Sequence, residues 1–240
     1  MSFLKAEWRK LAIANYAIDK NYLSEFVPYG TELDFYDGKC FVSLVGFMFE
    51  NTRLLGIKVP FHVDFEEVNL RFYVRRLENG KWKRGVVFIK EIVPKRALTF
   101  IANTVYNENY ETMPMSHSWS ENEDSREVQY TWTKSGKENK FKITASRASF
   151  EIVSGSETEF ITEHYWGYAK VNHVNSNEYE VTHPKWKAYV VKDYKIDVDF
   201  GAVYGEKFDF LNFLKPNSVM LAEGSEITVE NKKTIKKATQ

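Results

Sequence analysis

The sequence predicts a mainly β protein with a few short helices, and three observations support this fold class. Phe, Tyr and Trp make up 16% of the 240 residues, and these side chains favour the half-buried surface of a pleated sheet. Many segments alternate apolar and polar residues with the two-residue period of a strand. Turn-forming pairs such as Asn79-Gly80 and Ser135-Gly136 separate neighbouring segments of this kind, as expected for hairpins.

The strands are predicted from this alternation and from the turn signals between segments. They are expected at Lys39–Glu50, Phe65–Arg76, Gly85–Ile92, Arg126–Thr133, Lys140–Ser146, Thr162–Val171, Glu178–His183, Trp186–Phe200 and Ser218–Glu223. Phe65–Arg76 and Gly85–Ile92 form the clearest hairpin, because Asn79-Gly80 suits a tight turn between them.

Helical spacing is expected in two places. Ser2 can cap a helix through Tyr16 whose apolar side chains include Leu4, Trp8 and Leu11. A second helix is predicted at Lys95–Val105, after Pro94, with Ala97, Phe100, Ile101 and Val105 turned inward. Residues 113–125 are expected to be irregular, and the lysine-rich residues 232–237 to be a frayed end.

The bulk properties favour one soluble domain over residues 1–240. A β domain of roughly 200–250 residues is common as a single unit. Lys+Arg and Asp+Glu balance at 33 each, so no net charge favours a nucleic acid or an anionic membrane. The single Cys40 excludes a disulfide within the chain, and no signal peptide or membrane span is recognisable. A cytoplasmic location is therefore expected.

Familiar cofactor and catalytic motifs are absent. The chain has no GxGxxG or GxxxxGK[ST] loop, no GxSxG elbow and no HExxH pair. The five histidines are scattered, and Cys40 has no CxxC partner. We therefore expect no cofactor and no metal, and we expect Cys40 to be a buried, unreactive thiol.

One strand carries the most informative chemistry. In Phe65–Arg76 the apolar residues Val68, Leu70, Phe72 and Val74 share one face, and Glu67, Asn69, Arg71 and Tyr73 share the other, since side chains alternate along a strand. The polar face can simply meet water, where its charges contribute little to stability. If the sheet curls into a barrel, the same face lines a cavity instead.

In that second case the polar face forms a ligand site. Glu67 and Arg71 lie ~13 Å apart along the strand, so they would bracket a small molecule. Arg71 could hold a carboxylate, and Glu67 could transfer a proton. Further candidates are Tyr106, Tyr110, Glu111 and His164. Tyr106 and Tyr110 would act with Glu67 in catalysis. Asn69, Arg71, Tyr73, Glu111 and His164 would contact the ligand.

Several segments together resemble the YqjF-like family of uncharacterised proteins. They include Pro28-x-Gly30-x-x-Leu33-Asp34, Glu67-x-Asn69-Leu70-Arg71-x-Tyr73-Val74, Thr162-Glu163-His164-Tyr165 and His183-Pro184-x-Trp186. That family is similar to acetoacetate decarboxylase. The resemblance implies a curled, mostly antiparallel sheet around a central cavity, with Glu67 at the position of the strand carboxylate.

The resemblance also implies a difference in chemistry. In the decarboxylase, a lysine that follows a short helix forms a Schiff base with the β-keto acid. Here the corresponding residues are Tyr106-Asn107-Glu108-Asn109-Tyr110-Glu111, with no lysine. Lys90, on the adjacent strand, is the nearest alternative amine. Decarboxylation through a Schiff base is therefore not expected.

Three functional hypotheses remain open. The first is an enzyme or binder whose cavity takes a small anionic or carbonyl-bearing molecule. The second is a ligand sensor or carrier without catalysis, and the third is a structural protein whose cavity is filled by aromatic side chains. An exposed strand edge would also allow a homo-oligomer, although nothing in the sequence identifies that edge.

Overall fold

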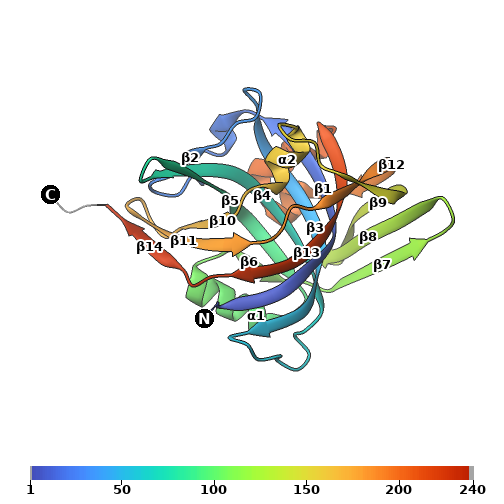
Figure 1. The fold of residues 1–240 in the computed structure, drawn as a ribbon, viewed down its shortest axis with the longest axis horizontal. Helices are drawn as coiled ribbons and strands as arrows, with labels where there is room; N and C mark the ends of the chain where they lie inside the picture. The colour runs from blue at the N-terminus through green and yellow to red at the C-terminus, as the bar shows by residue number, and fades with distance from the viewer. Residues whose placement is uncertain (1, 238–240) are drawn as a thin grey trace.

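The computed structural model describes residues 2–237, which form one strongly curled sheet with short helices at its margins (Figure 1). Part of this sheet closes on itself. Its strands lie in the order β11-β10-β5-β4-β3-β1-β13, and the ring closes where Val181 and Thr182 of β11 pair with Val229 and Thr228 of β13. The ring strands are β1 (Leu4–Ile18), β3 (Cys40–Leu54), β4 (Phe65–Glu78), β5 (Lys81–Val93), β10 (Trp166–Lys170), β11 (Asn175–Thr182) and β13 (Ser218–Val229).

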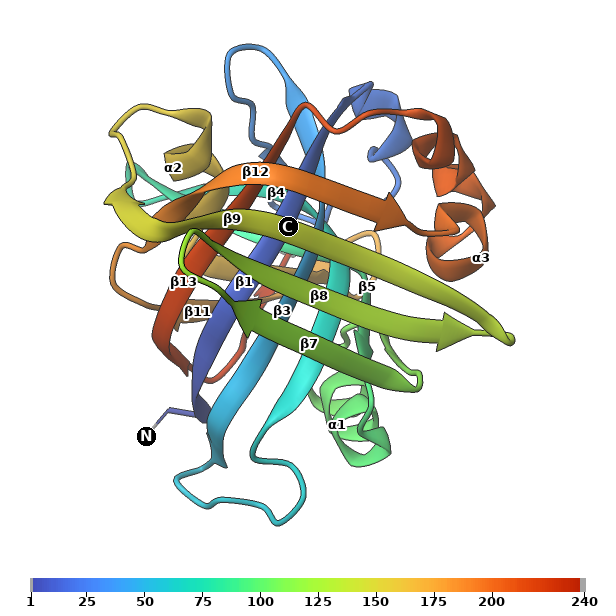
Figure 2. The ribbon, with the colours of Figure 1, turned by 90° about the vertical axis from the view of Figure 1, so that its right-hand side faces the viewer.

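Beyond β13 the sheet continues as a second layer. Figure 2 shows this extension crossing in front of β13, β1 and β3. Its strands are β12 (Lys187–Asp197), β9 (Lys137–Glu151), β8 (Ser125–Lys134) and β7 (Met115–Glu121). An outer core of buried aromatic and aliphatic side chains, including Phe72, Tyr130, Trp132 and Phe141, fills the space between the layers. The second layer thus covers the outside of the ring.

The remaining elements are short. They are β2 (Glu32–Leu33), β6 (Tyr110–Thr112), β14 (Lys233–Lys236), α1 (Arg96–Ile101), the π-helix η2 (Ala102–Tyr106), α2 (Glu157–Thr162), α3 (Phe200–Tyr204) and the 3-10 helices η1 (Lys20–Tyr22) and η3 (Glu206–Phe213). No helix among the described residues is long and apolar enough to cross a membrane.

The predicted mainly β fold is confirmed, with a mixed rather than purely antiparallel sheet. Most neighbouring strands are antiparallel, but β5 pairs in parallel with both β10 and β6. The hairpin of β4 and β5, with its turn at Asn79-Gly80, is as predicted. Both faces of β4 are buried: Val68, Leu70, Phe72 and Val74 face the outer core, and the polar face turns inward.

The helix predicted near the N-terminus is wrong, because residues 4–18 form strand β1. Its register against β3 shifts between Arg9 and Ala12, and Lys10 has a φ of 56°. This bulge turns both Trp8 and Leu11 inward, although they are three residues apart. Spacing of this kind resembles the period of a helix, which explains the error.

Three smaller predictions also need correction. Residues 115–121 form strand β7 instead of an irregular segment, and β14 pairs with β11 where a frayed end was expected. The predicted helix at 95–105 is α1 followed by the π-helical turn η2. Phe100 and Val105 are exposed and do not turn inward. Val105 lies in η2, where the wider turn of a π-helix changes which side chains share a face.

Candidate functional site

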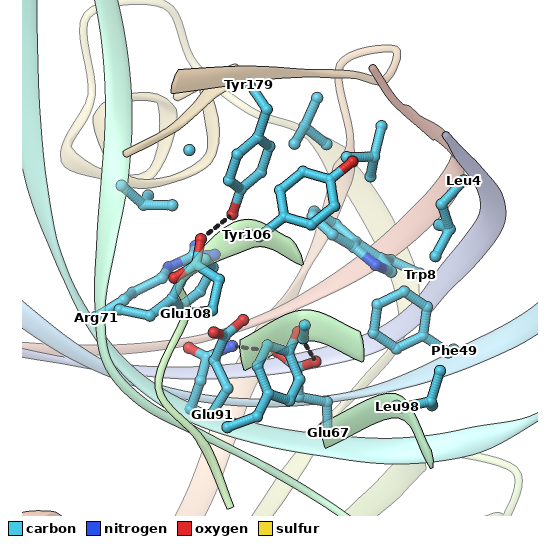
Figure 3. Close-up of a pocket in the computed structure, with 18 of the residues that line it drawn as sticks. Leu4, Trp8, Phe49, Glu67, Arg71, Glu91, Leu98, Tyr106, Glu108 and Tyr179 are labelled. Carbon is cyan, nitrogen blue, oxygen red and sulfur yellow. Dashed lines mark hydrogen bonds between the residues drawn. The ribbon is translucent and has the colours of Figure 1, made fainter. Parts of the chain in front are cut away.

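The ring encloses a cavity of about 140 Å³. Every ring strand contributes side chains to its wall, and α1, η2 and the segment before β6 close one side (Figure 3). Most lining residues are aromatic or aliphatic, but one end gathers polar groups from β4, β5 and β11. The aromatic side chains therefore do not fill the ring, and the third of the hypotheses above loses its basis.

The polar face of β4 lines this cavity. Glu67, Asn69 and Arg71 are 2%, 1% and 6% exposed, respectively. Asn69 donates a hydrogen bond from Nδ2 to Glu67 Oε1 at 2.9 Å, and the Tyr110 hydroxyl donates to Glu67 Oε2 at 3.2 Å. The face is thus turned away from bulk water, and the Glu67 carboxyl is held from two sides.

Two more glutamates join Glu67 at the polar end. Glu91 of β5 is 2% exposed, and Glu108 accepts a hydrogen bond of 2.8 Å from the Tyr179 hydroxyl at Oε1. We call Glu67, Glu91 and Glu108 the carboxyl cluster; all three line the cavity together with Arg71 (Figure 3). Among residues 2–237, no group of three or more His, Cys, Asp or Glu side chains has an arrangement that could hold a metal ion.

A bulge in β5 explains how Glu91 reaches the cavity. Leu70 pairs with Lys90, but Arg71 pairs with Phe88, so Ile89 is the extra residue. Phe88 and Glu91 both line the cavity as a result, although simple alternation would place them on opposite faces. Lys90 points elsewhere and forms an ion pair with Glu111 at 2.8 Å between Nζ and Oε2.

Burial raises the pKa values of the carboxyl cluster. It raises the pKa of Glu67 to about 7, against the hydrogen bonds from Asn69 and Tyr110 and the positive charge of Arg71. Burial and then the charge of Glu67 raise the pKa of Glu108 to about 8, despite the Tyr179 hydrogen bond. The pKa of Glu91 lies well above its usual range for the same reason, burial first and then the neighbouring glutamates. Near neutral pH this cluster therefore carries much less negative charge than three ordinary glutamates.

Arg71 is a buried cation without an ionic partner. Within the described part of the chain its guanidinium forms no ion pair or hydrogen bond, and its Nε is a buried donor without an acceptor. Its Cζ lies over the Tyr73 ring, at 5.8 Å from the ring centroid. Other buried polar atoms without a partner also belong to residues of the cavity wall: Trp8 Nε1, Asn69 Oδ1, Glu91 Oε2 and His164 Nδ1.

His164 lies at the edge of the polar end of the cavity, and Asp34, which is outside the cavity wall, orients its ring. Its Nε2 is 3.2 Å from Asp34 Oδ2, and Arg84 Nε donates to the same oxygen at 2.7 Å. Burial lowers the pKa of His164 to about 4, against the Asp34 hydrogen bond, and the nearby Arg84 and Arg71 cations add to this effect. The ring is therefore neutral near pH 7. With Asp34 as acceptor for Nε2–H, Nδ1 is the atom left to accept a hydrogen bond.

Three other predicted site residues lie differently. Tyr73 is buried behind the wall, where its hydroxyl lies 2.8 Å from Ser43 Oγ. The Tyr106 ring lines the cavity, but its hydroxyl donates to the Glu230 carbonyl at 3.4 Å and points away from the carboxyl cluster (Figure 3). Glu111 is outside the wall, paired with Lys90 and Lys134.

The comparisons with known proteins agree with this geometry. The model of the DUF2071 family, described as an uncharacterized conserved protein, matches residues 5–226. The chain belongs to the DUF2071 family. A curated relative is the uncharacterized protein YqjF of Bacillus subtilis (strain 168), 31% identical over 108 residues. This match covers 45% of the chain and only 43% of the length of YqjF.

Solved structures show where the fold of this DUF2071 chain recurs. Acetoacetate decarboxylase from Legionella pneumophila superposes with a TM-score of 0.66 at 12% identity, covering 97% of this chain and 86% of the decarboxylase. The enduracididine biosynthesis enzyme MppR, complexed with the condensation product of pyruvate and imidazole 4-carboxaldehyde, gives 0.68 at 11% identity over 98% and 90%. An acetoacetate decarboxylase-like enzyme from Sphingomonas wittichii RW1 gives 0.66 at 10% over 99% and 95%. The expected family and fold are thus confirmed, and at such identities the likeness concerns the fold alone.

Proposed function

We propose that the cavity binds a small organic molecule with an anionic or carbonyl group, and that Arg71 holds this group. The supporting observation is a buried guanidinium without an ionic partner, beside carboxyl groups whose raised pKa values reduce their negative charge near neutral pH. A buried cation is costly unless it is paired. A ligand carboxylate or carbonyl oxygen would supply the missing acceptor in the fork geometry that arginine favours.

Conversion of the ligand belongs to the same proposal, with Glu67 as the proton-transferring group. A pKa of about 7 suits a carboxyl group that both gives and takes a proton near neutral pH. Tyr110 contacts the same carboxyl group and would share this role. Schiff-base chemistry is not part of the proposal, because no lysine lies among the described residues that line the cavity.

Binding is tested by thermal shift and calorimetry with short carboxylates and β-keto acids. We expect binding to wild-type protein and a loss of at least tenfold in affinity for Arg71→Gln, since a charge-assisted hydrogen bond is worth about 1.5–3 kcal/mol. The matched control is Arg53→Gln, at an exposed arginine of β3, which should bind as the wild type does. Equal affinity in Arg71→Gln would contradict the proposal.

Catalysis is tested on each molecule that binds. Glu67→Gln keeps the shape of the side chain but cannot take a proton, so it should retain binding and lose turnover. Borohydride treatment in the presence of a β-keto acid should leave every lysine unmodified, whereas a trapped lysine adduct would restore the Schiff-base mechanism. Binding without turnover in the wild type would leave a carrier or sensor.

A further inference from the structure

The cavity has two chemically different ends. Arg71 and the carboxyl cluster occupy one end, while Leu4, Trp8, Phe49 and Leu98 lie together at the other, as Figure 3 shows. Phe3, Phe47, Leu54, Phe65, Ile101 and Val229 complete the apolar lining. A ligand that consisted of a polar group alone would leave this apolar surface uncovered.

Half-buried side chains occur at both ends of the wall. At the polar end Glu67, Asn69 and Arg71 are almost fully buried, whereas Glu108 is half-buried. At the apolar end Leu4 and Leu98 are half-buried, and they belong to β1 and α1. A ligand with its charged group at Arg71 would place its apolar part beside these two leucines, between β1 and α1.

The apolar wall is also preformed. Trp8 meets the Phe47 ring edge-on at 5.2 Å and the Phe49 ring at 6.0 Å, and Phe49 stacks on Phe65 at 4.7 Å between centroids. Contacts of this kind fix aromatic rings relative to one another. The wall thus presents a fixed apolar surface, which binds an apolar group without the cost of ordering its own side chains.

From these observations we propose that the natural ligand is an amphipathic carboxylate, with its charged group at Arg71 and an apolar tail of several carbons along Trp8, Phe49 and Leu98. This proposal rests on the proposed function and adds an apolar tail to the ligand described there. The neutral His164, with Nδ1 unpartnered at the polar end, further favours a head group that also carries a hydrogen-bond donor such as a hydroxyl.

The test is a series of straight-chain carboxylates from acetate to octanoate, titrated by calorimetry at pH 6. Each methylene that enters the apolar end should strengthen binding by about fourfold, the usual gain from removing a methylene from water. The gain should end once the tail reaches solvent. Arg71→Gln should weaken every member of the series by the same factor.

A substitution at the apolar end separates the tail from the head group. Leu98→Asp places a charge on the half-buried rim, and it should weaken octanoate at least tenfold while leaving acetate unchanged. The matched control is Leu214→Asp at an exposed leucine outside the cavity wall, which should bind both as the wild type does. If the aspartate variant does not fold, the milder substitution Leu98→Ala replaces it. This variant should bind octanoate more weakly than the wild type and acetate equally well.

The outcomes also separate this inference from the proposed function. Binding that depends on Arg71 but is equally strong for acetate and octanoate would overturn the inference that the ligand has an apolar tail. It would leave the proposed function intact. Failure of every carboxylate would overturn the inference and leave only a carbonyl-bearing ligand for Arg71. Binding of alkylamines with a dependence on Glu108 would overturn both the inference and the proposed function. Rising affinity along the series that is lost in Leu98→Asp would support both.

Discussion

At the scale of single residues, the site depends on how burial changes charge. Three glutamates and one arginine share a cavity largely lined by apolar side chains, and burial keeps the glutamates protonated to higher pH than in an unfolded chain. A folded state that binds more protons than the unfolded state loses stability as pH rises. The carboxyl cluster therefore lowers stability at neutral and alkaline pH while it prepares the site for an anion.

The substitution Glu108→Gln tests how much stability the carboxyl cluster costs the folded protein at high pH. The unfolded chain loses the Glu108 proton near pH 4.5, whereas the folded protein holds it to about pH 8. The substitution should therefore raise stability relative to wild type by roughly 2–4 kcal/mol at pH 8 and by much less at pH 5. Chemical denaturation at both pH values measures the difference. Glu151→Gln, at an exposed glutamate, is the control, and a difference that does not vary with pH would contradict the prediction.

The sequence predicted the site residues on β4 but missed part of the cluster. Strict alternation from Glu67 through Asn69 to Arg71 makes that face visible in the sequence. Glu91 stands next to Lys90, after the apolar run Val86–Ile89 of β5, and the bulge at Ile89 turns it inward. Tyr179 and Asp34 come from distant segments, so their approach to the site depends on tertiary packing that no local pattern encodes.

At the scale of elements, bulges and glycines shape the cavity wall. Gly167 of β10 pairs with Tyr179 of β11, and the Tyr179 ring lies directly over Gly167. A side chain at Gly167 would overlap this ring and push its hydroxyl away from Glu108. The small residue therefore holds a polar group of the site in place from the neighbouring strand.

Gly167→Ala should destabilise the protein by about 1–3 kcal/mol through overpacking and weaken binding of short carboxylates. A double-mutant cycle shows whether the Tyr179 ring is the cause. When Tyr179→Ala is already present, adding Gly167→Ala should cost little further stability, because the ring is gone. Additive losses in thermal denaturation would show that Gly167 acts through another contact.

Two of the errors in predicting elements have one physical origin, because both strands lack the alternation of polar and apolar residues. A strand whose two faces are both buried shows no polar and apolar alternation, as β1 illustrates with Ala12 and Ala14 on the outer core and Leu11 and Ile13 on the inner side. The bulge near Lys10 then adds helical spacing. At the opposite extreme, β7 is a largely exposed strand rich in serine, so it lacks an apolar face.

At the scale of the whole molecule, the strand pairings that close the ring differ in length. Long ladders join β3 to β1 and β4, whereas the seam between β11 and β13 consists of two residue pairs, Val181 with Val229 and Thr182 with Thr228. Local openings in proteins begin where few contacts hold the backbone. Closure of the ring was implied by the family resemblance, but the position of its seam could not be predicted, because β11 and β13 are far apart along the chain.

Hydrogen exchange should reveal this seam. The amide of Glu230, which donates to the Glu180 carbonyl across the seam at 2.9 Å, should exchange through local opening. Its exchange should be at least tenfold faster than that of the Leu44 and Leu70 amides in the central strands, which exchange only when the whole protein unfolds. A ligand that fills the cavity should slow exchange at the seam most. Equal protection at the seam and in β3 and β4 would contradict this picture.

The position of β1 in the ring also has a consequence for the synthesis of the protein on the ribosome. β1 is synthesised before the other strands of the ring, but one of its two neighbours is β13, which begins at Ser218. About 200 residues must be added between them, which takes on the order of 10–40 s at usual rates of translation. Throughout that interval one edge of β1 has no partner strand, and such an edge is prone to pair with other chains. The newly made chain therefore passes through a stage in which protection by a chaperone matters more than for a protein whose first strands pair only with each other.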